Sequence, residues 1–256
     1  MKKIFLILSI LTLSLFNFQS YASAASPSLD TIIKKYPSLQ LGVYFQDLTT
    51  NTLLASNLPN IQFTGASTTK VLTAITVIKQ IEAGRYGYDS MTSKNGYSVR
   101  TELKLMINQS NNEAWDVLNN LATWNSIIGE ARILNMVNYN CNGNLISPQS
   151  DAAMLTKLYA GQALNVSDTS YLLSLMQNTN EESLIRPALP ANAVYFHKYG
   201  WLNNGKSNVL NDTAIVLYNK HTYILSIYTN SPNVPNYSNQ KNAIQDITKY
   251  LFNISK

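Results

Sequence analysis

The order of secondary-structure patterns along the chain constrains its fold more than any other feature. Strand patterns occupy both ends of the chain, and helical periodicity fills the segment between them. The predicted strands are Leu39–Asp47 and Thr52–Ala55 near the N-terminus, and Ala193–Tyr199, Val209–Tyr218 and Thr222–Tyr228 near the C-terminus. A sheet assembled from the two ends, with a helical block inserted between them, accommodates this order.

The predicted helices fill the middle of the chain and flank the sheet at both ends. A short helix, Leu29–Tyr36, follows the capping residue Ser28 and ends at Pro37. The others are the apolar run from Val71, then Val99–Asn108, Asn111–Leu121, Trp124–Leu134, Gln149–Tyr159, Thr169–Gln177 and Asn239–Phe252. We therefore predict an α/β (α+β) fold. Residues 25–66 and 191–256 would form an antiparallel sheet with flanking terminal helices, and residues 67–190 an all-helical part, with a cleft where the two meet.

The first residues have the pattern of a secretory leader. Two lysines follow Met1, an apolar stretch runs from Ile4 to Phe16, and Ala22-Ser23-Ala24 matches an A-x-A cleavage site. We predict a signal peptide over residues 1–24 and a mature domain over residues 25–256, located outside the cytoplasm in the cell envelope or secreted. The apolar stretch is too short to cross a bilayer comfortably, so no stable membrane insertion is expected after cleavage; an uncleaved tether is the alternative.

Composition excludes several classes of function. Loss of two lysines with the leader would reduce the net charge from +5 to +3 (5 − 2), and no basic run points to nucleic acid. The single cysteine, Cys141, cannot form an intramolecular disulfide. With two histidines, one cysteine and no metal-binding spacing, no metal or other cofactor is expected.

The stretch from Thr64 to Lys70 has the features of a nucleophilic site. Ser67 is predicted at the N-terminus of the helix that contains Val71, where free backbone N–H groups favour negative charge. Lys70 lies three residues further on, hence on the same helix face, and would become a usable base if burial lowered its pKa. A serine hydroxyl needs such a partner to act as a nucleophile. An ordinary capped amphipathic helix is the alternative interpretation.

Two further stretches carry suitable polar groups. Ser110 precedes a predicted helix and would either cap it or relay a proton to a leaving group, while the amide of Asn112 would bind a substrate carbonyl. Lys198 lies on the first strand of the C-terminal meander, followed by Gly200, which would let a substrate lie against the strand backbone. Alternatively, this lysine only protects an edge strand from aggregation.

Together these stretches resemble a known signature. The motifs S-x-x-K, S-x-N and K-x-G occur in this order, the third on a strand, as in class A β-lactamases and penicillin-binding proteins. The resemblance extends over the mature chain and includes the run from Ser183 to Pro190.

The resemblance implies a role for each motif residue. Ser67 would be the acylated nucleophile and Lys70 its proton acceptor. Ser110, helped by Lys198, would pass a proton to the departing nitrogen, and Asn112 would hold the substrate amide. The remaining substrate-binding positions would be Tyr199, Gly200 and Trp201, with the backbone N–H groups of Ser67 and Trp201 forming an oxyanion hole. His197 and Asp212 lie on adjacent predicted strands, where they would pair beneath the site or His197 would bond to the backbone.

The chain departs from the family pattern at three places. Class A β-lactamases carry a deacylating glutamate on a loop, but Val137–Pro148 contains no Asp or Glu, and Glu130, Glu181 and Glu182 are predicted on helices outside it. Tyr199 replaces the usual Thr or Ser that binds a substrate carboxylate. Asn111 replaces the usual Asp, which keeps the hydrogen-bonding shape without the charge.

The sequence thus predicts a secreted serine hydrolase that forms an acyl-enzyme on Ser67 with a β-lactam or related amide and deacylates slowly. Two alternatives remain: a D,D-peptidase-like enzyme acting on peptidoglycan peptides, and a non-catalytic penicillin-binding or sensor protein. A structural envelope protein would instead be indifferent to Ser67→Ala.

Overall fold

The computed structural model describes residues 28–255 apart from residues 93, 95, 204, 206 and 233–236. The predicted leader, residues 1–24, lies outside this range. Within it, no helix has both the length and the apolar character needed to cross a membrane.

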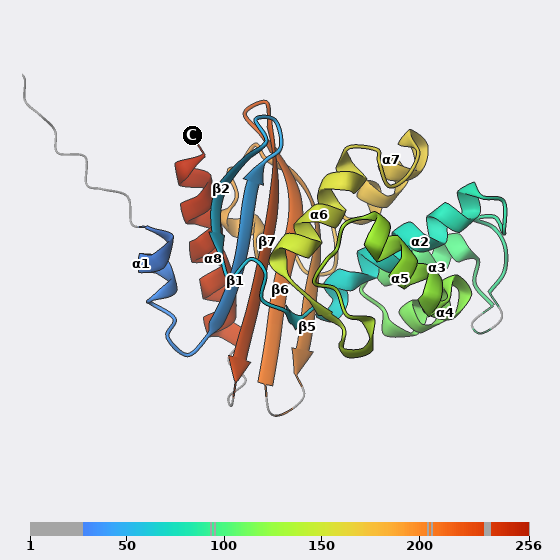
Figure 1. Ribbon diagram of the computed structural model, residues 1–256, viewed down its shortest axis with the longest axis horizontal. Coiled ribbons are helices and arrows are strands. Elements are labelled where there is room, and N and C mark those ends of the chain that lie inside the picture. Colours follow the sequence, from blue (N-terminus) through green and yellow to red (C-terminus); the bar gives the residue numbers. More distant parts are fainter. Residues whose placement is uncertain are drawn as a thin grey trace, which may run out of the picture.

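A five-stranded antiparallel sheet, in the order β2-β1-β7-β6-β5, forms the centre of the molecule (Figure 1). Its strands are β1 (Gln40–Asp47), β2 (Thr52–Asn57), β5 (Val194–Asn203), β6 (Ser207–Tyr218) and β7 (His221–Pro232). Strand β1 pairs with β7, so the two ends of the chain share one sheet, as predicted. The last three strands are longer than predicted, and Asn219 and Lys220 form the tight turn between β6 and β7 with positive φ angles, 50° and 67°.

The helices agree with the sequence predictions except at their ends. They are α1 (Leu29–Ile33), α2 (Lys70–Glu82), α3 (Val99–Ile107), α4 (Asn112–Ala122), α5 (Trp124–Ile133), α6 (Pro148–Tyr159), α7 (Val166–Leu175) and α8 (Tyr237–Ile254). Helix α7 begins earlier than predicted because the side chain of Asn165 caps it, accepting the N–H of Asp168. Helix α1 is shorter than predicted and ends at the cap residue Lys34.

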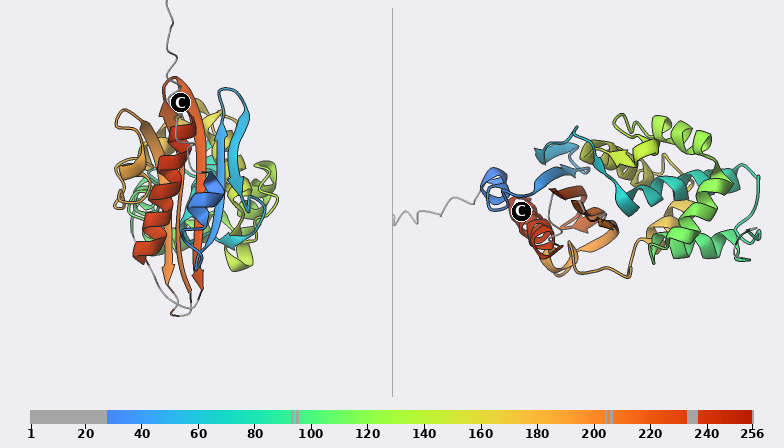
Figure 2. Two further views of the ribbon diagram at one scale, coloured as in Figure 1. Left: turned by 90° about the vertical axis from the view of Figure 1, so that its left-hand side faces the viewer. Right: turned by 90° about the horizontal axis from the view of Figure 1, so that it is seen from below.

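The two faces of the sheet have different covers. Helices α1 and α8 lie side by side on one face (Figure 2), where Phe252 of α8 packs against Phe45 and Tyr223 of the sheet. Helix α6 packs against the other face, and the remaining helices lie beyond it. The sheet therefore presents its β5 and β6 strands to the segment that enters the helical block.

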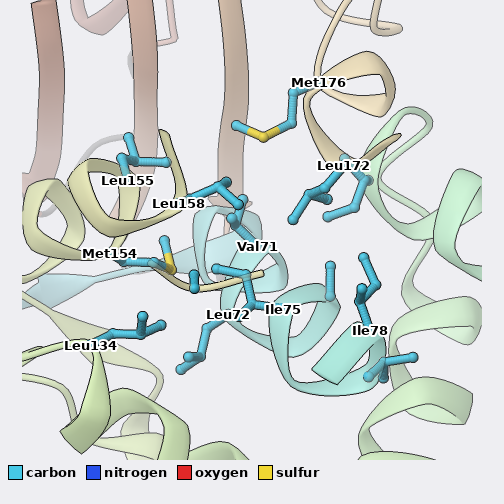
Figure 3. Packing of buried hydrophobic residues seen from close by; sticks show 14 of the residues in the cluster. Val71, Leu72, Ile75, Ile78, Leu134, Met154, Leu155, Leu158, Leu172 and Met176 are labelled. Atoms are coloured by element: carbon cyan, nitrogen blue, oxygen red, sulfur yellow. The ribbon is translucent and has the colours of Figure 1, made fainter. Parts of the chain in front are cut away.

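Helix α2 forms the centre of the helical block. Val71, Leu72, Ile75 and Ile78 are fully buried, and α2 is enclosed by α3, α4, α5 and α7 (Figure 3). A helix that is apolar on most of its faces has to be buried. Because close-packed cores resist displacement, α2 gives the residues at its N-terminus a fixed position against the sheet.

Candidate active site

Ser67 lies in a tight turn immediately before α2. The turn is a 3₁₀ helix, η1 (Ala66–Thr69), and Ala66 has a positive φ of 50°. Two hydrogen bonds hold the turn from behind: Thr68 Oγ1 donates to Gly65 O at 2.9 Å and lies 2.9 Å from the hydroxyl of Tyr228 on β7. The sequence placed Ser67 at the start of the helix; the structure places it in the 3₁₀ turn that leads into the helix.

Lys70 is completely buried at the first position of α2. Its Nζ donates to the carbonyl oxygen of Ser110 at 2.7 Å and to Asn112 Oδ1 at 2.8 Å, and lies 5.2 Å from the centre of the Trp115 ring. Burial lowers the pKa of Lys70 to about 7, against an opposing effect of the Asp116 charge. A substantial fraction of Lys70 is therefore neutral near pH 7 and able to accept a proton.

Ser110 lies between the two lysines. Lys198 Nζ donates to Ser110 Oγ at 2.9 Å, and Lys70 Nζ lies 3.5 Å from the same oxygen. Ser110 does not cap α4; Asn111 does, through its side-chain oxygen and the N–H of Ala114, which leaves the Ser110 hydroxyl available to the lysines. Ser110 has a positive φ of 57°, a strained conformation of the kind found at functional sites.

Lys198 is fully buried on β5, so the interpretation as an exposed edge-strand lysine is wrong. Burial lowers its pKa well below the usual value, and the nearby charge of Lys70 adds to this effect. The Nζ of Lys198 also donates to the carbonyl oxygen of Tyr199 at 2.9 Å. Burial and mutual repulsion thus favour a state in which at least one of the two lysines is neutral.

Gly200 packs against the turn that contains Ser67, η1 (Ala66–Thr69). A Cβ atom built on Gly200 would lie 2.8 Å from Gly65 O and 2.9 Å from Ser67 N, closer than side chains tolerate. A glycine is therefore required for β5 to approach Ser67. The backbone of β5 thus lies directly against the turn of Ser67.

His197 sits beneath the site in a charged cluster. Its Nδ1 lies 2.9 Å from Asp212 Oδ1, and its Nε2 lies 2.9 Å from Thr179 Oγ1 and 3.3 Å from Glu182 Oε1. Burial alone would lower the pKa of His197, but the charge and hydrogen bonding of Asp212, together with those of Glu182, raise it to about 9. The predicted pairing with Asp212 is confirmed, and the protonated ring ties β5 to β6 and to the segment that precedes β5.

The prediction that Glu181 and Glu182 lie on a helix is wrong. Both follow the end of α7 in a segment without helical structure. Helix α7 ends at Leu175, and the segment that follows it places Glu182 against Tyr195 and His197 of β5. Glu182 contacts His197, and Tyr195 Oη donates to its second oxygen. Glu130 does lie on a helix, α5, where it pairs with Lys79 at 3.1 Å.

Tyr199 and Trp201 alternate with Lys198 and Gly200 along β5. The Tyr199 hydroxyl donates to Asn180 Oδ1 at 3.1 Å, and the Trp201 indole N–H donates to Asn208 Oδ1 at 3.0 Å. Hydrogen bonds join Lys70 to Ser110 and Asn112, and Lys198 to Ser110, while the backbone of Gly200 packs against that of Ser67. The side chains of Tyr199 and Trp201 instead border a neighbouring pocket.

Asn144 is a residue of the site that the sequence analysis missed. It directly precedes strand β4 (Leu145–Ile146), which pairs with strand β3 (Phe63–Thr64) just before the turn of Ser67. The Asn144 amide donates to Ala66 O at 2.9 Å and accepts from Thr69 Oγ1 at 2.8 Å. The turn-like run Asn142-Gly143-Asn144 was its only signal in the sequence.

A buried carboxyl lies behind the turn and was also missed. Asp151 of α6 is completely buried and accepts hydrogen bonds at Oδ2 from Ser226 at 2.8 Å and from Thr213. Burial raises the pKa of Asp151 to about 6, although hydrogen bonds from the hydroxyls of Thr213, Ser226 and Tyr228 oppose the effect. Tyr228 connects this group to Thr68.

Among the residues that the structure describes, no three His, Cys, Asp or Glu side chains gather where they could hold a metal ion. The polar groups that these hydrogen bonds connect beside the turn of Ser67 are instead two amines, one hydroxyl and an amide. This set can exchange protons with a serine nucleophile and with a leaving group.

Comparisons with known proteins agree with the geometry. One solved structure that superposes on this chain is described as PBP-A (L158E mutant) in an acyl-enzyme complex with penicillin G. Its TM-score is 0.79 at 20% identity, and the match covers 88% of this chain and 93% of that one. A β-lactamase from Chitinophaga pinensis superposes with a TM-score of 0.79 at 21% identity, and the match covers 89% of this chain and 98% of that one. A β-lactamase from Sphaerobacter thermophilus superposes with a TM-score of 0.77 at 17% identity, and the match covers 87% of this chain and 94% of that one.

These likenesses, all below 25% identity, show a shared fold. No curated protein sequence matches the chain. The model of the Beta-lactamase enzyme family matches residues 24–254. The match extends over nearly the whole sequence and includes all the motif residues around Ser67, and this chain therefore belongs to the Beta-lactamase enzyme family.

Proposed function

We propose that this β-lactamase-like hydrolase forms an acyl-enzyme on Ser67 with a β-lactam or a related amide. The observation that carries the proposal is Lys70, an amine next to the nucleophile turn whose burial brings its pKa to about 7. Neutral Lys70 would take the proton of the Ser67 hydroxyl as its oxygen attacks the carbonyl carbon. The N–H groups of Ser67 and Trp201 would stabilise the oxyanion, and Asn112 would hold the substrate amide.

Breaking of the C–N bond then needs a proton for the departing nitrogen. Ser110 Oγ would supply it, and the proton that Lys70 took from Ser67 would replace it, either directly or through Lys198, whose Nζ lies 2.9 Å from that oxygen. Lys70 and Lys198 both reach Ser110, so the proton taken from Ser67 can return to the leaving group through a single hydroxyl. The proton balance closes without an external acid.

We further propose that deacylation is slow. Hydrolysis of the ester needs a base for the attacking water, and the loop from Val137 to Pro148 carries no carboxylate. The side chain that this loop brings to the nucleophile turn is the amide of Asn144, which does not accept protons. Glu130 and Glu182 are engaged with Lys79 and His197.

The carboxylate-free loop also favours a second candidate, a D,D-peptidase-like enzyme whose substrates are peptidoglycan peptides. An acceptor amine, or a water activated by Lys70, would then release the acyl group. Either activity fits a protein exported by the leader-like residues 1–24 to the cell envelope, which we propose as its location. A non-catalytic penicillin-binding or sensor protein would acylate once and release nothing.

Intact-mass spectrometry of the protein during incubation with a penicillin, repeated with Ser67→Ala, tests the proposal. A mass increase of one penicillin that requires Ser67 and persists is expected. An adduct that disappears while product accumulates would contradict slow deacylation. Absence of any adduct would contradict acylation by penicillins, and the same measurement with a thioester of a D-alanyl peptide would then decide between the D,D-peptidase alternative and a silent site.

A further inference from the structure

A pocket lies beside β5, the strand that carries Lys198 and Gly200. It has a volume of about 240 Å³ and is lined by Glu181, Tyr199, Trp201, Leu210 and Tyr237. Tyr199 and Trp201 are the two neighbours of Gly200, the residue whose backbone contacts the nucleophile turn. The volume is below the roughly 300–1,000 Å³ typical of pockets for whole ligands, so this pocket fits one chemical group of a larger molecule.

The walls of the pocket are aromatic and partly open to solvent. Trp201 is 53% exposed and Tyr237, at the first turn of α8, is 37% exposed. Core packing does not require large rings at such exposed positions. The faces of Trp and Tyr rings attract cations within about 6 Å of the ring centre, and the Tyr199 ring already has Lys198 Nζ at 4.2 Å from its centre.

One wall carries a negative charge. Glu181 accepts the N–H of Ser183 at 2.8 Å and the hydroxyl of Tyr237 at 3.0 Å. Partial burial would raise its pKa, but the hydrogen bonds from Ser183 and Tyr237 and the charge of Lys241 lower it, so the carboxylate is ionised. No cation of the described residues forms an ion pair with Glu181 within 4.0 Å. The carboxylate is thus fixed by neutral donors and lacks a close counter-charge.

We propose that this pocket binds an ammonium group of the substrate that acylates Ser67. Three aromatic rings and one carboxylate are the combination that stabilises a positively charged nitrogen, and an anionic group would be repelled by Glu181. Tyr199, one wall of this pocket, stands where the family resemblance implies a short hydroxyl for a substrate carboxylate. The inference rests on the proposed acyl transfer for its link to Ser67, while the binding itself does not depend on acylation.

The test uses the Ser67→Ala variant, in which acylation cannot interfere. The chain has three tryptophans, so the indole N–H resonances of Trp115 and Trp124 serve as internal controls for that of Trp201 in a titration followed by NMR. The probes are n-butylammonium, choline and 3,3-dimethyl-1-butanol, the last being a neutral isostere of choline. We expect the two cations to shift the Trp201 signal and the neutral alcohol to have little effect. Comparison of the two cations shows whether a primary or a quaternary ammonium is preferred.

Two charge variants sharpen the test. Glu181→Gln removes the charge but keeps one of the two acceptor oxygens that Ser183 and Tyr237 use, and is expected to weaken cation binding about tenfold or more. Lys241→Gln removes a repelling charge and is expected to strengthen binding, while Asp30→Asn on the exposed surface of α1 should leave it unchanged. Equal binding of the neutral isostere, or unchanged binding in Glu181→Gln, would overturn the cation site.

The link to the substrate needs a separate measurement. In the protein with Ser67 intact, n-butylammonium or choline should slow acylation by a cationic acyl donor with a half-maximal concentration equal to its NMR dissociation constant. Cation binding without this competition would overturn the substrate assignment. If no acyl donor acylates Ser67, the proposed function fails, but the NMR result still decides whether the pocket binds cations.

Discussion

Lys198 Nζ and Ser110 Oγ lie 2.9 Å apart, and this hydrogen bond joins β5 to the segment before α4 across 88 positions of the sequence. It brings a buried amine into hydrogen-bonding contact with the Ser110 hydroxyl. Because Lys70 contacts the same residue, Ser110 is the point at which the two amines can exchange a proton.

Replacement of Ser110 by alanine should slow acylation by about 100-fold to 10,000-fold, the usual contribution of a positioned acid or base. Lys198 loses its hydroxyl acceptor in this variant but keeps the carbonyl oxygen of Tyr199. The rate of adduct formation with a penicillin checks the prediction; it is measured by quenching the reaction at successive times and determining the intact mass. An unchanged rate would mean that the leaving group takes its proton from elsewhere; circular dichroism of the variant controls for folding.

The acylation rate should rise with pH and level off above about 7. Lys70 accepts a proton only when neutral, and burial lowers its pKa to about 7. Below that value the rate should fall about tenfold per pH unit. Lys70→Arg, which stays protonated at every accessible pH, should show no acylation. A flat profile between about pH 5 and 8 would exclude Lys70 as the base.

Gly200→Ala should impair both stability and acylation. The added methyl group would meet Gly65 O at 2.8 Å and Ser67 N at 2.9 Å, which forces the strand away from the turn at a cost of about 1–3 kcal/mol. Gly129→Ala in α5 is the matched control, because its Cβ would meet nothing within 4 Å. That variant should gain up to about 1 kcal/mol from helix propensity. Urea unfolding of both variants gives the comparison.

The stabilising effect of His197 should disappear at high pH. Its pKa is raised from 6.5 to about 9, so its contribution is complete below about pH 6.5 and is lost as the pH rises through about 9. The shift corresponds to at most about 3 kcal/mol. Lys70 and Lys198 have lowered pKa values, so their contribution to stability rises with pH in this range. The measurement is therefore the difference in unfolding free energy between wild type and His197→Asn as a function of pH. A difference independent of pH would contradict the charged cluster.

Asp151 should destabilise the protein as it ionises. Its pKa is raised from 3.8 to about 6, so the folded state holds a proton that the unfolded state has lost between these values. Stability from this group therefore falls as the pH rises from about 4 to about 6, by up to about 3 kcal/mol. Relative to wild type, Asp151→Asn should become steadily more stable over that range. A constant difference in unfolding free energy would show that Asp151 is ionised throughout.

The sequence predicted the elements of the fold and the order of the motifs because both depend on local patterns. Alternating and helical periodicities indicated the sheet from both chain ends and the buried helix after Ser67. It erred at the start of α7, where it missed the local cap of Asn165, and in the segment of Glu181 and Glu182. Hydrogen bonds from Tyr195 and His197 of β5 to Glu182, rather than helix propensity, hold that segment.

The sequence by itself determined which groups are available for chemistry: a serine and a lysine one turn apart, Ser110 with Asn112, and Lys198 with Gly200, on a chain whose loop lacks a carboxylate. Only the tertiary structure decided their states. Burial lowers the pKa of Lys70 to about 7, and its hydrogen-bond partner Ser110 lies 40 positions away in the sequence. Asn144 and Glu182 reach the site through pairing and packing between distant segments, which no local sequence pattern specifies.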